Sequence, residues 1–244
     1  MIGDININLR SIPAFKLLSD SSIKDIENDA QLLKYPIGQP ICINKDLIPN
    51  KIIVILSGEA RLIYKKGIQS LTISKLTTDS FIGLASLLRV EGCELAAASN
   101  EVLAMAISDH LILSIYSKEV GFRKWCDNQI QIAEAYEISN YLQKDKIDNY
   151  LDIKESIDLI LNNTILKVKN DGEKLDLIDN YIYIVGSGNL IDKTIGEMIK
   201  ESAIVRTRGP LPARIFKIPK NIYEKFDNSK INKLEKIKKS KSLE

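Results

Sequence analysis

Few side chains in this sequence have the chemistry of a catalytic or metal site. There is one histidine, His110, and the three cysteines, Cys42, Cys93 and Cys126, are unevenly spread and form no CxxC pair. A structural zinc site needs about four such ligands at fixed spacing, and a nucleophilic triad needs a serine or cysteine with a histidine and an orienting group. We therefore expect a non-enzymatic protein with no metal and no cofactor. Three unpaired thiols favour the reducing cytoplasm.

The segment FIGLASLL at 81–88 differs from its surroundings, because a glycine is followed by small and apolar residues with no alternation. This pattern predicts one turn of helix set into a loop. The segment interrupts a series of short β runs that starts at Tyr35, and LysLysGly at 65–67 predicts a hairpin between two of these runs. Helical spacing of apolar residues predicts short helices over 11–33 and helical structure over 109–142.

The second half of the sequence repeats the first in outline. After a helical stretch at 151–163, β-like runs begin again, and AspGly at 171–172 predicts a hairpin between two of them. ILSGEARLI at 55–63 is echoed by IVGSGNLI at 184–191, FIGLASLL by TIGEMI at 194–199, and LAMAIS at 103–108 by RIFKIP at 214–219. The order is kept while the spacing contracts, which predicts a shortened second copy. Chance matching of short strings is the alternative.

Composition excludes several classes of function. The net charge of +2 gives no general attraction for nucleic acid, and no window approaches the ~18 apolar residues of a membrane span. The basic excess gathers in a Lys-rich run at the end of the chain, which is typical of a solvated terminus. We expect a soluble, cytoplasmic chain that binds no nucleic acid.

Four segments together resemble the cyclic-nucleotide-binding domain. They are the early helix with Phe15 and LSD at 18–20, YPIGQP at 35–40, VILSGEARL at 54–62, and FIGLASLL leading to ASNEVLAMAI at 98–107. The resemblance implies an α+β, mainly β fold of two double-stranded β-rolls of the jelly-roll type in tandem, with flanking helices. The expected domains are a first roll with its C-terminal helices at 1–145, a second, shortened roll at 146–228, and the Lys-rich tail at 229–244.

The sequence departs from that family at two positions of the phosphate-binding insert. In members of that family, a glycine and the following amides approach the cyclic phosphate, a glutamate binds the ribose hydroxyl, and an arginine pairs with the phosphate. Gly83 is kept, but Leu84 stands at the glutamate position and Glu94 at the arginine position. A unit charge about 4 Å from the phosphate is worth roughly 4 kcal/mol at an effective dielectric of 20. We therefore expect no useful cAMP or cGMP binding in the usual pose.

What the insert does instead has two interpretations. In one, it forms a pocket retuned for an uncharged or cationic ligand, lined by Gly83, Leu84, Ala85, Ser86, Cys93, Glu94, Leu95 and Ser99. In the other, Leu84 fills the pocket and Glu94 points into solvent, so that the module binds nothing. An ion pair between Arg89 and Glu94 is a further possibility.

The second half keeps Gly196 and Glu197, but it has no insert of the family length. Arg206 and Arg208 could meet a phosphate, although two arginines in a polar hairpin are usually exposed. LRVEGCE at 88–94, FRKWCDN at 122–128 and PLPARIFKIP at 210–219 look similar to the N-terminal regulatory segment of cyanobacterial peptide or bacteriocin exporters of the ABC class. This chain has neither the membrane spans nor the phosphate loop of those exporters.

The expected function is a regulatory or interaction module with a small ligand of unknown type. A protein partner is expected to be an exporter or a second copy of the chain, which would form a homodimer through the helix 117–142. The alternative is a transcription regulator of the catabolite activator type, which binds a small ligand and DNA. The β-like region after 150 argues against it, because it supplies no pair of helices with a basic recognition face.

Overall fold

The computed structural model describes residues 8–66, 69–143 and 150–226, and the Lys-rich run expected at 229–244 lies outside them. The chain divides into two compact units, Met1–Ala133 and Glu134–Glu244. Each unit has a hydrophobic core of its own. The predicted boundary between 145 and 146 stays a prediction.

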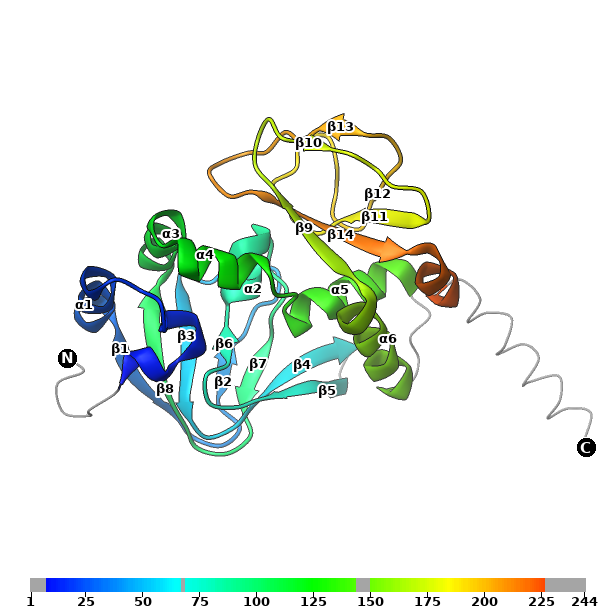
Figure 1. Ribbon diagram of the computed structural model, residues 1–244. Helices are drawn as coiled ribbons and strands as arrows, with labels where there is room; N and C mark the ends of the chain where they lie inside the picture. The colour runs from blue at the N-terminus through cyan, green and yellow to red at the C-terminus, as the bar shows by residue number, and fades with distance from the viewer. Residues whose placement is uncertain (1–7, 67–68, 144–149, 227–244) are drawn as a thin grey trace, which may run out of the picture. The chain divides into compact units, whose positions relative to one another are not determined.

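The first unit is a roll of two four-stranded antiparallel sheets (Figure 1). One sheet has the order β1 (Gln31–Tyr35), β8 (Val102–Ser108), β3 (Lys51–Ser57) and β6 (Phe81–Ile82). The other has the order β2 (Pro40–Cys42), β7 (Ala96–Ala98), β4 (Ala60–Lys66) and β5 (Gln69–Leu76). The antiparallel pairing of β4 with β5 confirms the hairpin predicted at 65–67.

β-Branched and small apolar residues explain why these strands form a closed core. In β3, four consecutive residues from Ile52 to Ile55 are buried, as expected for a strand covered on both faces. The turn into β4 depends on Gly58, whose φ is +91°. A Cβ at this position would lie 2.1 Å from the carbonyl oxygen of Glu101, so only glycine allows the strands to approach this closely.

Short helices flank the roll. Two 3₁₀ turns, Leu9–Ser11 and Pro13–Phe15, precede α1 (Asp20–Asp29), and α2 (Leu84–Arg89) is the predicted turn of helix between β6 and β7. After β8 come α3 (Asp109–Lys118) and α4 (Val120–Asp127). An aromatic cluster packs these segments together, with the ring centroids of Phe15 and Phe81 5.7 Å apart and those of Phe81 and Trp125 5.3 Å apart.

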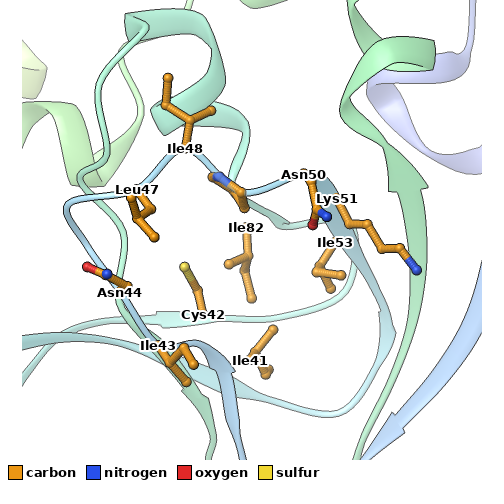
Figure 2. A pocket seen from close by; sticks show the side chains of 12 residues that line it. Ile41, Cys42, Ile43, Asn44, Leu47, Ile48, Asn50, Lys51, Ile53 and Ile82 are labelled. Carbon is orange, nitrogen blue, oxygen red and sulfur yellow. The ribbon is translucent and has the colours of Figure 1, made fainter.

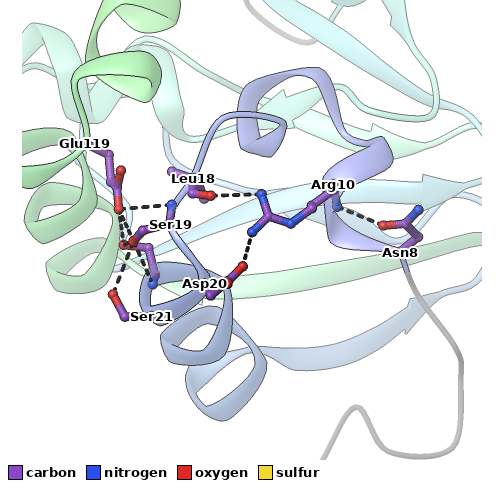
Figure 3. Close-up of polar contacts among 8 residues, drawn as sticks. Asn8, Arg10, Leu18, Ser19, Asp20, Ser21 and Glu119 are labelled. Atoms are coloured by element: carbon purple, nitrogen blue, oxygen red, sulfur yellow. Dashed lines mark hydrogen bonds and ion pairs between the residues drawn. The ribbon is translucent and has the colours of Figure 1, made fainter.

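A polar cluster fixes the start of α1 (Figure 3). Ser19 caps the helix by accepting from the backbone N of Ser22, and the carboxylate of Glu119 accepts from the hydroxyl groups of both serines. These hydrogen bonds lower the pKa of Glu119 below its ordinary value of 4.5. Since Glu119 lies between α3 and α4, it ties the junction of these helices to the start of α1.

The stretch 117–142, expected as a single helix, is broken. α3 ends at Lys118, α4 runs from Val120 to Asp127, and α5 covers Ile132–Gln143. Glu119 has an extended backbone (φ −97°, ψ 101°), which explains the first break. The stretch predicted to form the homodimer contact therefore comprises the end of α3, all of α4 and most of α5. The homodimer itself stays a prediction.

The second unit contains most of α5, then α6 (Tyr150–Asn163) and two antiparallel sheets. The four-stranded sheet has the order β12 (Met198–Ile199), β11 (Tyr181–Val185), β14 (Ala213–Pro219) and β9 (Ile165–Lys169). The two-stranded sheet pairs β10 (Lys174–Leu175) with β13 (Ala203–Ile204). Because β9 pairs with β14 and β10 with β13, the turn at Asp171 and Gly172 joins strands of different sheets, and the hairpin expected there is wrong.

A buried ion pair holds α5 to the sheet of the second unit. Glu134 on α5 and Arg214 on β14 are 0% and 2% exposed, and their side chains join through Nε to Oε1 at 2.6 Å and Nη2 to Oε2 at 2.9 Å. Such a two-pronged contact fixes both partners in one geometry. The structure thus confirms the predicted class of fold, helices with antiparallel β-sheets that form a roll, while the interpretation of the second unit as a shortened repeat stays a prediction.

Candidate functional site

The insert between β6 and β7 starts at Gly83, the N-cap residue of α2. Its φ of +94° is a conformation that residues with a side chain rarely adopt. A Cβ here would lie 2.7 Å from Cγ of Pro49, so glycine also permits the close packing of the loop between β2 and β3. The backbone N of Gly83 donates to the side chain of Glu94 within the insert.

The carboxylate of Glu94 occupies the start of α2. Its Oε1 accepts from the backbone N of Gly83 at 2.8 Å, and its Oε2 accepts from the backbone N and the hydroxyl group of Ser86 at 2.9 and 2.8 Å. Glu94 is 4% exposed, so the interpretation that places it in solvent is wrong. A charged acceptor at two backbone amides is among the stronger hydrogen-bonding arrangements in proteins.

The remaining predicted residues of the insert are packed rather than open. Leu84, Ala85, Cys93 and Leu95 are all buried, and Ser99 is half-buried with its backbone N donating to the carbonyl of Glu59. The structure thus brings Gly83, Ser86, Cys93 and Glu94 into one cluster. It does not bring Ser99 into that cluster through any described contact.

Burial also makes the thiol of Cys93 unreactive. Its backbone N donates to the hydroxyl group of Ser86 at 3.1 Å. Desolvation, followed by the nearby charge of Glu94, raises the pKa of Cys93 to about 12, although Arg89 acts in the opposite direction. Arg89 itself is 1% exposed, and its ion pair with Glu94 stays a prediction.

A cavity of about 430 Å³ adjoins the insert (Figure 2). Of the predicted site residues only Gly83 belongs to its lining, and most of the rest comes from Ile41 and Cys42 at the end of β2 and from the loop 43–50. Ile53 of β3 and Ile82 of β6 complete the wall. Sequence reasoning missed this cavity. The available signal was the presence of Ile43, Leu47 and Ile48 in a loop whose other residues, apart from Pro49, are polar.

In the second unit, Gly196 and Glu197 lie in a tight turn. Gly196 has a φ of +83°, and the carboxylate of Glu197 accepts from Nζ of Lys193 at 2.7 Å and from the backbone N of Thr194 at 3.2 Å. Those contacts, led by Lys193, lower the pKa of Glu197. Arg206 and Arg208 are exposed, as expected for arginines in a polar hairpin.

Metal and membrane signals are missing from the part of the chain that the structure describes. Within residues 8–66, 69–143 and 150–226, no three histidine, cysteine or acidic side chains come together as metal ligands. His110 is exposed, 3.9 Å from the carboxylate of Asp109. No described helix has the length and hydropathy required to cross a bilayer.

Comparisons with known proteins show likeness at the level of three-dimensional structure. No protein-family model matches the chain, and no curated protein does. The regulatory domain of Toxoplasma gondii PKA, solved with cAMP, is 11% identical, with 95% of this chain and 94% of that one covered at a TM-score of 0.42. The Thermus thermophilus catabolite activator protein is 20% identical, with 54% of this chain and 68% of that one covered at a TM-score of 0.39.

A third solved structure is a cyclic nucleotide-binding domain from Methylobacillus flagellatus. It is 16% identical, with 48% of this chain and 70% of that one covered at a TM-score of 0.40. Likeness of this size carries no conclusion on ligand or activity. Only the geometry of this chain's own residues therefore bears on its function.

Proposed function

We propose that this chain is a non-enzymatic regulatory module of the cyclic-nucleotide-binding-like class in which its own Glu94 takes the place of the ligand's phosphate. The observation that carries the proposal is the set of three hydrogen bonds from Gly83 and Ser86 to the buried carboxylate. In the family that the sequence resembles, the amides at this position face the cyclic phosphate. Here a tethered anion already satisfies them.

Glu94 opposes a cyclic nucleotide in two ways. Its side chain fills the space that a phosphate would need, and its charge repels a second anion by roughly 4 kcal/mol at about 4 Å and an effective dielectric of 20. Since each 1.4 kcal/mol or so is tenfold in affinity, that term alone weakens binding by about three orders of magnitude. Leu84, 0% exposed, adds an apolar side chain where the family has a glutamate for the ribose.

The proposal extends to the second unit, to a ligand and a protein partner, and to the location of the chain. The second unit is a shortened repeat of the first, with Gly196 in the same left-handed conformation as Gly83 and with β12 pairing with β11 as β6 pairs with β3. Its described strands stand where an activator-like regulator would have paired DNA-binding helices. The proposal also includes a small ligand and a cytoplasmic location. The proposed protein partner is an exporter of the ABC class or a second copy of the chain.

Isothermal titration calorimetry with cAMP and cGMP tests the central claim. We expect no saturable binding to the wild-type chain at ligand concentrations up to about 1 mM, where family-type binding of micromolar affinity would be complete. Glu94→Gln is the matched control, because it removes the charge while nearly keeping the shape. Micromolar 1:1 binding to the wild-type chain would overturn the proposal.

A further inference from the structure

The cavity lies where the two sheets of the first unit end. β2 is the terminal strand of one sheet and β6 the terminal strand of the other, and within the described residues neither has a second strand partner. Ile41 and Cys42 line the cavity from β2, while Ile82 lines it from β6. The loop 43–50 covers the cavity between these two strands and forms most of the rest of its wall.

The lining is mainly apolar, and its polar side chains are those of Asn44, Asn50 and Lys51. Figure 2 shows Ile41, Cys42, Leu47, Ile53 and Ile82 directed toward the same space. Ile53 and Ile82 are 6% and 1% exposed and belong to the core of the roll, so the cavity continues that core outward. Leu47, by contrast, is 61% exposed at the cavity wall. A ligand that covers such water-exposed apolar surface lowers the free energy, because it removes that surface from water.

The charges around the cavity disfavour an ionic ligand. Among the described residues of the lining only Lys51 is charged, and its Nζ donates to Oε1 of Gln31 and points away from the cavity in Figure 2. Glu94 is engaged with Gly83 and Ser86. Desolvation raises the pKa of Cys42 to about 11, which leaves a neutral thiol at physiological pH. The described lining thus offers a cation no partner of opposite charge, and it offers an anion only Lys51, whose Nζ is directed away from the cavity.

We infer that this cavity binds a small, uncharged, mainly apolar molecule beneath the loop 43–50. A volume of about 430 Å³ suits such a molecule, since small-molecule sites are concave, mostly apolar and about 300–1,000 Å³ in size. A protein partner would need a far larger surface than one loop and two strand ends. The inference rests on the proposed function, because it assigns a ligand class to a roll whose anion position is occupied by Glu94.

Two contacts connect the cavity with the insert. The thiol of Cys42 donates to the backbone carbonyl of Glu94 at 3.2 Å. The loop backbone also packs directly on Gly92, where a Cβ would lie 2.3 Å from the carbonyl oxygen of Lys45 and 2.5 Å from the backbone N of Leu47. A ligand that displaces the loop therefore acts on the segment that holds Glu94, which gives the module a route from ligand to structural change.

N-Phenyl-1-naphthylamine, an uncharged apolar fluorophore, is the probe for this site. We expect saturable 1:1 binding to the full chain, weakened about tenfold or more by Leu47→Asp, because an unpaired charge would face an apolar cavity. Ile37→Asp is the matched control: Ile37 is 75% exposed and lies outside the lining, so its substitution should change the dissociation constant less than about twofold. Both side chains are exposed, so circular dichroism should show intact folds.

Alkylation of Cys42 gives a second readout. Cys42 is half-buried while Cys93 and Cys126 are buried, so iodoacetamide should modify Cys42 first, and bound fluorophore should slow that reaction in the wild type but not in Leu47→Asp. No saturable binding, or equal binding by Leu47→Asp, overturns the inference and leaves the proposed function intact. Micromolar cAMP binding would instead defeat the proposed function.

Discussion

Glu94→Ala is expected to destabilise the first unit strongly. The substitution leaves three buried donors without their acceptor, namely the backbone N–H groups of Gly83 and Ser86 and the hydroxyl group of Ser86, whose oxygen still accepts from the backbone N of Cys93. A hydrogen bond to a charged group contributes about 1.5–3 kcal/mol, and an unsatisfied buried donor costs about 1–3 kcal/mol. We therefore expect a loss of about 3–5 kcal/mol in the free energy of unfolding.

Urea and thermal unfolding measure this loss. At roughly 3 °C per kcal/mol for a unit of this size, the melting temperature should fall by about 10–15 °C. Sodium formate should restore part of the stability of Glu94→Ala, because formate supplies a carboxylate to the freed amides. Sodium chloride at equal ionic strength should not restore it, and formate should leave the wild type unchanged.

Glu94→Gln should fall between the wild type and Glu94→Ala, because its amide keeps one acceptor oxygen but turns an NH₂ group toward the second donor. A loss below about 1 kcal/mol for Glu94→Ala, with no formate effect, would refute the interpretation of this carboxylate as the internal ligand of the insert.

Three further predictions concern other parts of the chain. Arg214→Met should cost about 3–5 kcal/mol in urea unfolding by leaving Glu134 as a buried unpaired charge, and most of that loss should disappear in the double variant with Glu134→Leu; additive losses would contradict this. The pKa of Glu119 is lowered in the folded state, so its contribution to stability is present above pH 4.5 and is lost as pH falls through the folded pKa. Glu119→Gln should therefore unfold less steeply below pH 4.5 than the wild type, which acid titration by circular dichroism measures. Gly92→Ala should lower stability by about 1–3 kcal/mol in urea, because the added Cβ meets backbone atoms of the loop, and an unchanged midpoint would show that the loop yields freely.

Local patterns predicted helices and short β runs, whereas the predicted roll rested on the resemblance to the cyclic-nucleotide-binding domain. Short β runs punctuated by glycine and proline predicted strands in the first unit, and Gly83 followed by small and apolar residues predicted the short helix α2. The pairing of β9 with β14 was not predictable, because the turn signal at Asp171 and Gly172 fixes a change of direction but not the strand partner.

The candidate site was predicted in part. The family resemblance singled out Gly83 and Glu94 as the positions expected to decide ligand chemistry, but it did not give the direction of the Glu94 side chain. That direction depends on amides brought within reach by tertiary structure, which spacing along the chain does not reveal. The cavity beside Leu47 was missed for the same reason, since it forms only where two sheet edges and a loop meet.

The covalent attachment of Glu94 has a thermodynamic consequence. An ordinary effector stabilises its receptor by an amount that rises with its concentration, so occupancy follows supply. A carboxylate carried on the same polypeptide has no such dependence, and dilution, depletion or competition by cellular anions leaves its occupancy almost unchanged. The N–H groups of the insert are thus occupied as soon as the chain has folded. A ligand whose concentration varies therefore has to act on this protein at another site.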